Sequence, residues 1–339
     1  MDGPGQTALV VTSVASPTAC MRQLAAGAQA TGIRFYCIGD ATSPPDFRLD
    51  GCEFLSLQAQ AKLGYRYAGM APQRHYARKN LGYLYAMGQG AQVILETDDD
   101  NSPLSGFWEA PPKASLRPVQ GSGWYNVYEW FGVDAWPRGF PLERLHAGNA
   151  GFEVGPEKVC RPLIWQGLVA GEPDVDAIFR LTRRGPVDFL DRPPLFLGRG
   201  TWSPLNSQNT RWAISAFPLL YLPATCSFRA TDIIRGYVAI RCVWEIDGGV
   251  AFLPPTVVQE RNAHDLMRDF KDELEIYTKA LDIVRALEAT KLQTGLEASL
   301  DNVVRCYEAL VGVGAVEEME LKLVRAWCED LENLTLLRP

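Results

Sequence analysis

Short apolar runs and helix-like segments alternate along the first hundred residues. Residues 8–14 and 33–38 are rich in β-branched and aromatic side chains, which predicts two buried strands. Between them, a helix is expected to start at Ser16 and Pro17, because serine is a common N-cap and proline suits the first helical position. Its alanine- and glutamine-rich pattern continues to about Thr31. The pattern indicates a β-α-β unit.

A second alternation follows, with a helical pattern over residues 75–89 and an apolar strand over residues 93–95. Repeated β-α-β spacing predicts the α/β class, with a mostly parallel central sheet and helices on both faces. Residues 102–255 are rich in tryptophan, proline and glycine, and we expect them to continue the same domain with long binding loops.

The pattern changes near residue 259. Apolar residues from Leu266 to Leu281 recur at spacings of three and four, as on one helix face, and further helical stretches cover residues 296–310 and 316–334. Residues 260–339 hold 17 acidic and 10 basic side chains, whereas the first 259 residues hold 23 of each. We therefore expect an α/β domain, residues 1–258, and an acidic C-terminal helical region, residues 259–339, suited to oligomer or partner contacts.

Composition and missing motifs exclude several classes of protein. The 339-residue chain has a net charge of −7, whereas a general nucleic-acid binder needs a basic surface. None of the eight cysteines has C-x-x-C spacing, and the P-loop, dinucleotide-binding and G-x-S-x-G motifs do not occur. The N-terminus lacks a signal-peptide pattern, and no apolar stretch approaches ~18 residues. We expect a reduced, cytoplasmic protein without a transmembrane segment.

Three consecutive aspartates, Asp98, Asp99 and Asp100, follow the third strand. Like charges crowded at a strand end are costly, and a divalent cation that prefers oxygen ligands, Mg²⁺ or Mn²⁺, relieves the repulsion. The alternative is a solvated acidic turn. His264, near the end of the α/β domain, is a candidate to complete the metal shell, although a surface histidine at a helix start is the commoner case.

Polar residues also follow the first two strands. Thr12 and Ser13 end the first strand, and Asp40 comes directly after the second. Ligands of such sheets bind in the crevice beyond the carboxyl ends of the strands. We therefore expect these residues and the acidic triplet to line one crevice.

Three basic residues precede the acidic triplet on the predicted helix. Arg74 and Arg78 share a helix face at i,i+4, and Lys79 follows directly. Cations at this place would complement a bound diphosphate across from the metal, and the alternative is a solvated helix face. Acidic and basic residues together favour a nucleotide diphosphate as the ligand.

The middle of the chain offers further candidates. Asp174 and Asp176 lie two residues apart in a loop, where either could supply a base for an attacking hydroxyl. Alternatively, they cap a helix and complement its dipole. Arg138 lies in the sequence Trp-Pro-Arg-Gly, in which the flanking residues restrict the backbone and so fix the direction of its side chain. Residues 206–209, Asn-Ser-Gln-Asn, form either a turn or a polar cluster suited to sugar hydroxyls.

Several motifs, taken in order and spacing, resemble one family. They are RKNLGYLYA from Arg78, AWPRGFPLE from Ala135, PDVD from Pro173 and PLNSQNT from Pro204. The sequence resembles the DUF288 or STELLO family of glycosyltransferase-like proteins over about residues 7–258, with the acidic helical tail outside the match. The motifs around Arg138 and Pro173 are also similar to those of the reversibly glycosylated polypeptides, the UDP-arabinopyranose mutases.

Both resemblances imply the GT-A fold, a nucleotide-sugar-binding α/β/α sandwich with a D-x-D metal site. They imply that Asp98 and Asp99 contact the nucleotide or the metal, and that Asp100 binds Mn²⁺ or Mg²⁺. The remaining expected contacts place Thr12, Ser13 and Asp40 at the nucleoside and Arg78 and Lys79 at the departing diphosphate.

The resemblance implies a metal-dependent glycosyltransferase that moves a sugar from a nucleotide-sugar donor, a UDP-sugar, to a hydroxyl acceptor in bacterial-type glycan synthesis. Asp174 or Asp176 would be the base of an inverting transfer. The alternatives are a UDP-sugar mutase, in which the arginine matching Arg138 is linked to glycosylation, and a non-catalytic scaffold that binds partner transferases through the acidic tail.

Overall fold

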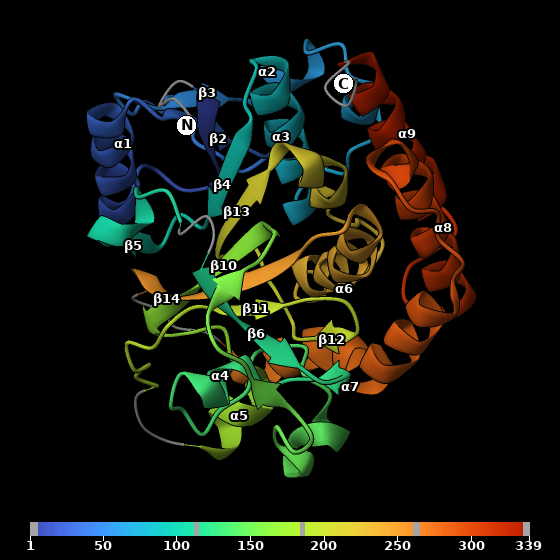
Figure 1. Ribbon diagram of the computed structural model, residues 1–339. Helices are drawn as coiled ribbons and strands as arrows, with labels where there is room; N and C mark the ends of the chain where they lie inside the picture. Colours follow the sequence, from blue (N-terminus) through green and yellow to red (C-terminus); the bar gives the residue numbers. More distant parts are fainter. Residues whose placement is uncertain (1–5, 112–114, 184–186, 260–264, 335–339) are drawn as a thin grey trace.

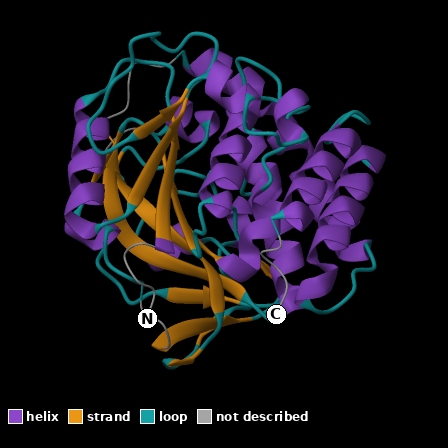
Figure 2. Ribbon diagram, turned by 90° about the horizontal axis from the view of Figure 1, so that it is seen from above, coloured by secondary structure: helices purple, strands orange, loops and turns teal. Residues whose placement is uncertain are grey.

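The computed structural model describes residues 6–111, 115–183, 187–259 and 265–334 (Figure 1). A central sheet forms the middle layer, and helices cover both of its faces (Figure 2). Helix α1 (Ala19–Thr31) lies on one face, whereas most of the other helices lie on the opposite face. The α/β class predicted from the sequence pattern is confirmed.

Twelve strands of the described chain form this sheet, in the order β3-β2-β1-β4-β13-β10-β14-β11-β6-β8, with β5 on β14 and β9 on β6. Their bounds are β1 Thr7–Thr12, β2 Arg34–Ile38, β3 Glu53–Leu55, β4 Val93–Thr97, β5 Asn101–Pro103, β6 Ser115–Gln120, β8 Glu153–Val154, β9 Lys158–Val159, β10 Pro162–Gly171, β11 Leu195–Leu197, β13 Asn209–Ala213 and β14 Gly249–Gln259. A separate pair joins β7 (Gly123–Trp124) to β12 (Thr201–Trp202).

The sheet is parallel where the β-α-β pattern predicts it. Strands β3, β2, β1 and β4 all run in one direction. Strand β13 then runs antiparallel between β4 and β10, and β10 pairs with β14 in parallel. The C-terminal ends of β1, β2, β4, β10 and β14 therefore lie at the same edge of the sheet.

The first β-α-β unit follows the predicted order with one shift. Five of the six residues of β1 are buried, as in a strand covered on both faces. Helix α1 is capped by Thr18, whose side chain accepts from the Met21 N–H, so the prediction of a cap at Ser16 is wrong. The helix ends where Gly32 adopts a left-handed φ of 71°, which suits glycine.

Helix α3 (Lys79–Gly88) begins later than the sequence pattern predicts. A single 3-10 turn, Tyr76–Arg78, precedes it, and Arg74 stands before that turn with a φ of 55°. Arg74 and Arg78 therefore do not share a helix face. The helix packs closely on the sheet, because a Cβ at Gly82 would lie 2.6 Å from side-chain atoms of Val10 and Ile38.

The remaining helices of the described chain complete the structure. They are α2 Leu57–Ala61, α4 Val127–Trp130, α5 Ala177–Thr182, α6 Thr231–Val243, α7 Leu266–Ala289, α8 Ser299–Gly312 and α9 Glu320–Asn333. Helices α7 and α8 pack on α6, and the buried Trp327 of α9 donates from its indole to the carbonyl of Pro218. One hydrophobic cluster extends from the sheet into α7, α8 and α9.

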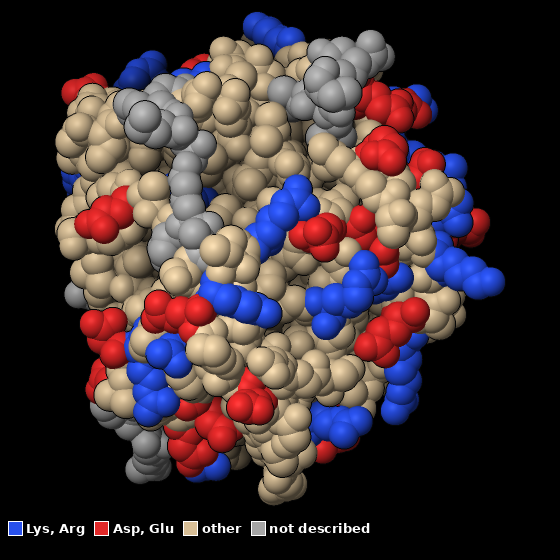
Figure 3. Space-filling model, in the orientation of Figure 1, with Lys and Arg blue, Asp and Glu red and all other residues tan. Residues whose placement is uncertain are grey.

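The acidic residues of the C-terminal helices are divided between surface and interior. Basic and acidic side chains are interspersed over these helices on the face drawn in Figure 3. Asp269, Glu273, Glu320 and Asp330 are buried. Part of the negative charge of this region therefore lies inside the protein. The eight cysteines are free thiols, and no helix among the described residues is long and apolar enough to cross a membrane.

Candidate functional site

A pocket of about 610 Å³ opens at the carboxyl ends of β1, β2 and β4. This edge is where α/β sheets bind their ligands. The predicted residues that line it are Thr12, Ser13, Asp40, Arg74, Arg78, Asp98, Asp99, Asp100, Arg138 and Asp174, with Ser207 and Gln208 of the polar cluster. Lys79 and Asp176 are not among the described residues that line the pocket, and His264 lies outside the described residues.

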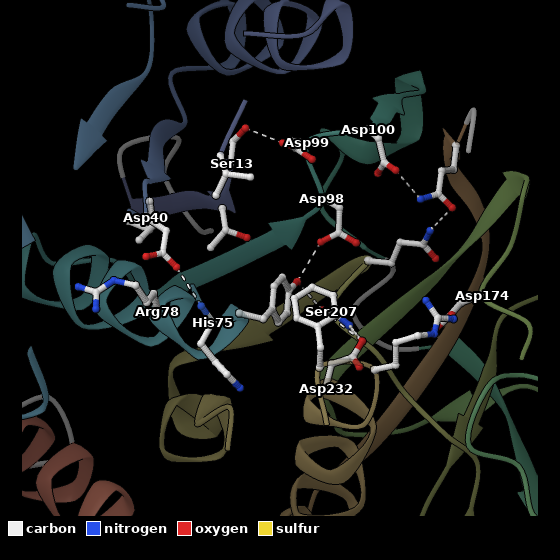
Figure 4. A pocket seen from close by; sticks show the side chains of 18 of the residues that line it. Ser13, Asp40, His75, Arg78, Asp98, Asp99, Asp100, Asp174, Ser207 and Asp232 are labelled. Atoms are coloured by element: carbon white, nitrogen blue, oxygen red, sulfur yellow. Dashed lines mark hydrogen bonds between the residues drawn. The ribbon is translucent and has the colours of Figure 1, made fainter. Parts of the chain in front are cut away.

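The ends of β1 and β2 form one side of the pocket. Ser13 Oγ donates to Asp99 Oδ2 at 2.5 Å, and Asp40 Oδ2 accepts from the His75 backbone N–H at 2.9 Å (Figure 4). His75 Nδ1 accepts from the Ala77 N–H. Burial lowers the pKa of this imidazole despite the nearby Asp40, so the ring is neutral at pH 7 and caps the turn before α3. The end of β2 and this turn are thus joined.

Asp98 lies at the centre of the pocket (Figure 4). Its Oδ1 accepts from the Tyr76 hydroxyl at 2.9 Å and lies 3.7 Å from Lys79 Nζ. Desolvation raises the pKa of Asp98 to about 7, while Lys79 lowers it and the neighbouring Asp100 raises it further. Near neutral pH this buried carboxyl is therefore stabilised either by taking up a proton or by a nearby cation.

The other two carboxyls of the triplet point in different directions (Figure 4). Asp99 faces Ser13, and desolvation raises its pKa although the Ser13 hydroxyl lowers it. Asp100 Oδ2 accepts from Gln259 Nε2 at 2.9 Å, which ties the triplet to the end of β14. Asp100 Oδ1 is buried, and no group in the described parts of the chain bonds to it. It is an acceptor that lacks a partner.

Two of the three basic residues predicted beside a diphosphate are turned toward the protein. The Arg78 guanidinium donates to Gln60 Oε1 and to the carbonyl oxygens of Ala71 and Pro72. Lys79 is fully buried and donates to the Tyr76 hydroxyl and the Thr97 carbonyl. Arg74 is exposed, lines the pocket, and has no hydrogen bond to another described residue. Arg74, not Arg78 or Lys79, is the cation available to a ligand.

Arg138 joins two carboxylates at the far side of the pocket. Its guanidinium forms a bidentate pair with Asp174, at 2.7 and 2.9 Å, and a second pair with Asp232 of α6 at 3.0 Å. Burial lowers the pKa of Arg138, but the two carboxylates outweigh it and the pKa lies well above its usual value. Burial likewise raises the pKa of Asp232, and Arg138 brings it below its usual value. Arg138 and Asp232 are therefore both charged.

Asp174 and Asp176, the two candidates for a base, occupy different surroundings. Asp174 lines the pocket and also accepts from Asn206 Nδ2 at 2.8 Å. Asp176 has no exposed surface and is the N-cap of α5, where it accepts from the Phe179 N–H and the Trp136 indole. The structure thus shows Asp176 as a helix cap, the alternative reading of the sequence, and of these two carboxyls Asp174 is the one at the pocket.

Several pocket residues were not predicted as site residues from the sequence. They include His75, Tyr76, Arg180, Phe228, Arg229, Asp232 and Gln259, whereas Ser207 and Gln208 belong to the polar cluster at residues 206–209 that the sequence did indicate. The run of polar residues at 206–209 is visible in the sequence and could predict site residues. The other residues lie in no sequence motif that would have identified them. No group of three or more histidine, cysteine, aspartate or glutamate side chains within the described residues is arranged to hold a metal ion by itself.

Comparison with known proteins identifies relatives over most of the chain. The family model described as "STELLO glycosyltransferases" matches residues 229–339. The Arabidopsis thaliana proteins "Probable glycosyltransferase STELLO1" and "Probable glycosyltransferase STELLO2" are 31% and 30% identical over 95% of this chain. The chain spans 44% of the length of each. The resemblance to the STELLO family is confirmed, but the prediction that the helical tail lies outside it is wrong, because the family model covers the tail.

Solved structures are more distant. Glucosyl-3-phosphoglycerate synthase from Mycobacterium tuberculosis, in complex with Mn²⁺, uridine diphosphate and phosphoglyceric acid, is 11% identical with a TM-score of 0.39, covering 84% of this chain and 77% of that one. A structure described as a mycobacterial protein gives 10% identity and a TM-score of 0.41, covering 83% and 75%. The fold described above does not rest on these weak likenesses.

Proposed function

Because the chain is related to the STELLO glycosyltransferases, we propose that it is a metal-dependent glycosyltransferase that moves a sugar from a UDP-sugar donor to a hydroxyl acceptor. The observation that carries the proposal is the meeting of Asp98, Asp99 and Asp100 with the ends of β1 and β2 in one pocket. A bacterial-type glycan is the acceptor we expect.

The residues of the pocket fit a divalent metal. Asp100 Oδ1 is a buried acceptor without a partner in the described chain, and Asp98 carries a raised pKa that a cation would lower. Mg²⁺ and Mn²⁺ are bound in such sites by one or two carboxylates together with phosphate oxygens of the substrate. Asp98 and Asp100 would hold the metal, which when bound supplies a Lewis acid for charge on the departing diphosphate. His264 remains a proposal as a third ligand.

The donor would bind across the strand ends. Thr12, Ser13 and Asp40 would line the nucleoside, and the Ser13 hydroxyl holds Asp99 toward that side. Arg74 would face the diphosphate, since it has donors that no described residue occupies. Arg78 and Lys79 would act indirectly: Arg78 holds the loop at Ala71 and Pro72, and Lys79 holds Tyr76, which donates to Asp98.

Asp174 would accept the proton of the attacking hydroxyl. Three hydrogen bonds from Arg138 and Asn206 fix its carboxylate, and an ionised carboxylate has acceptor capacity for a fourth. Arg138 would therefore position the base. Its donors are directed at Asp174, Asp232 and the Arg229 carbonyl, which argues against Arg138 as a site of sugar attachment and so against the mutase alternative.

The test is a panel of nucleotide-sugars with Mn²⁺, followed by thermal shift and by hydrolysis of the donor. We expect UDP-sugars to raise the melting temperature of the wild type only when Mn²⁺ is present. Asp100→Ala should lose this effect, whereas Asp134→Ala, at a side chain that is 90% exposed, should keep it. Donor hydrolysis that persists in a chelator, or that survives Asp100→Ala, would exclude the metal-dependent mechanism.

A further inference from the structure

Residues 224–229 connect Tyr221 to helix α6, and the last two of them reach the pocket. Phe228 and Arg229 both line the pocket. The Phe228 side chain is 59% exposed, and its ring lies edge-on to Tyr76 with centroids 5.7 Å apart. An aromatic ring left open in a pocket offers a flat apolar surface to a ligand. We call residues 224–229 the aromatic wall.

The aromatic wall is fixed by the C-terminal helices. Glu320 of α9, which is fully buried, accepts from the backbone N–H groups of Ala224 and Thr225 at 3.0 and 2.8 Å and from the Thr225 hydroxyl at 2.7 Å. The Ser227 hydroxyl donates to the carbonyl of Asp272 on α7. Since these contacts hold the backbone on both sides of the turn, the Phe228 ring is presented from a rigid support.

Arg229 is held by the same helices and is charge-balanced. Its Nε donates to Glu273, a fully buried carboxylate of α7, and lies 4.0 Å from Asp269. The two terminal nitrogens of Arg229 make no hydrogen bond to the described residues. A cation already paired with carboxylates is a poor site for an anion, but its free N–H groups remain good donors to hydroxyl oxygens.

The aromatic wall lies on the side of the pocket that holds the proposed base. Arg138 donates both to the Arg229 carbonyl and to the Asp174 carboxylate, so the wall and Asp174 share one anchor. Asp174 lies across the pocket from Ser13 and Asp40, with Asp98 between them (Figure 4). Arg229 is therefore next to the group that would receive the acceptor's proton, and Phe228 lies against Tyr76, beside the central Asp98.

We propose that Phe228 and Arg229 form the acceptor subsite and bind a neutral pyranose ring. The apolar C–H face of the sugar lies on the Phe228 ring, and its hydroxyl oxygens accept from the terminal nitrogens of Arg229. This inference rests on the proposed function, and it assigns to helices α7 and α9 the task of building that subsite. The sugar of the donor is also a pyranose ring and could bind in the same way. The test therefore distinguishes the acceptor sugar from the donor sugar.

Saturation-transfer NMR tests the subsite with methyl pyranosides of glucose, galactose and mannose as probes, in the presence of UDP and Mn²⁺. We expect a saturation-transfer signal, which reports binding, for at least one pyranoside with the wild type. Phe228→Ala should weaken it by roughly three- to tenfold, the range of one aromatic contact. Leu274→Ala, at a comparably exposed apolar residue of α7, should leave it unchanged. Equal transfer in the wild type and Phe228→Ala would overturn the proposal, as would no transfer to any pyranoside.

Two further measurements separate the possible failures. UDP binding in the same samples reports on the proposed function: UDP that binds while the pyranosides do not overturns the subsite alone. The affinities of UDP and UDP-glucose distinguish the sugar source. A Phe228→Ala protein that loses affinity for UDP-glucose but not for UDP would place the donor sugar on the wall and overturn the acceptor assignment; unchanged affinities for both support it.

The support of the wall is tested by a matched pair of variants. Glu273→Gln keeps the shape of the side chain but removes the charge that pairs with Arg229. We expect the saturation-transfer signal of the pyranosides to fall while UDP binding persists. Asp330→Asn changes another buried carboxylate of the same region, which accepts from Arg66 and Tyr67 away from the pocket, and should leave both unchanged. A Glu273→Gln protein that folds and keeps full pyranoside transfer would contradict the assigned support.

Discussion

Asp174 and Asp176 lie two residues apart on the same loop, yet they differ in solvent access. Asp174 lines the pocket and is paired with the Arg138 guanidinium. Asp176 is fully buried, and although its bonds to the Phe179 N–H and the Trp136 indole lower its pKa, burial raises that pKa to about 6. A carboxyl that caps a helix in the interior contributes to stability in a pH-dependent way.

Asp176→Asn should therefore change the pH dependence of stability. The folded-state pKa of Asp176 is raised above its unfolded value, so its favourable contribution is complete below about pH 4 and is lost as the pH rises through about 6. The shift corresponds to roughly 3 kcal/mol. Asparagine can still cap the helix, so the variant should lose less stability than the wild type between these pH values. Urea titrations at pH 4 and pH 7 measure the free energy of unfolding. An equal loss of this free energy between the two pH values in the variant and the wild type would contradict the prediction.

Residues at the strand ends could be predicted from sequence, but the far side of the pocket could not. Thr12, Ser13, Asp40 and Asp98 follow strands whose apolar runs are visible, and the parallel rule brings their ends together. Asp232 reaches the pocket only because α6 places it against Arg138, a contact between distant segments. Local patterns do not contain such pairings.

Helix α3 and its preceding turn decide where the basic residues point. The sequence pattern predicts one continuous helix from residue 75, but the 3-10 turn over Tyr76–Arg78 changes the register before α3 begins. As a result Lys79 faces the interior and Arg78 donates to Gln60, whereas Arg74 lies exposed at the pocket. The close approach of α3 to the sheet at Gly82 fixes this register, because the side chains of Val10 and Ile38 occupy the space of a Cβ.

Gly82→Ala should destabilise the protein by about 1–3 kcal/mol, the usual cost of overpacking a core. Alanine is the better helix former, so any loss comes from the contact with the sheet and not from helix propensity. Gly312→Ala provides the control, since Gly312 ends α8 with nothing within 4 Å of the added Cβ. Thermal unfolding followed by circular dichroism compares the two. A Gly82→Ala protein as stable as the Gly312→Ala protein would show that α3 can move away from the sheet without cost.

The C-terminal helices differ from the rest of the chain in composition but not in packing. The shift in charge near residue 259 predicts a boundary, and that boundary at 258/259 stays a prediction. The packing favours one cooperative unit: Trp327, Tyr307 and Ile283 are fully buried in the cluster that includes Tyr221 and Tyr237. Composition reports what a segment contains, whereas the cluster depends on how the faces of α6 and α8 fit together.

A chain ending at residue 258 should therefore lose cooperative unfolding. It would expose the apolar surface of α6 and leave the backbone N–H groups of Ala224 and Thr225 without Glu320. Tryptophan fluorescence during thermal unfolding, compared with the full chain, measures this. A truncated protein that shows a sharp transition and still binds UDP with Mn²⁺ would establish residues 1–258 as an independent domain.

The order of strands in the sheet also affects how fast the pocket can form. Strand β4, which leads into Asp98, has β13 as one neighbour, and the two are separated in sequence from Thr97 to Asn209. Closing a loop of this length must precede the pairing, and chains dominated by such long-range contacts fold slowly. During synthesis, β1, β2 and β4 can assemble early, but Asp100 cannot accept from Gln259 until that residue has left the ribosome. The pocket is then among the last parts of the molecule to be completed.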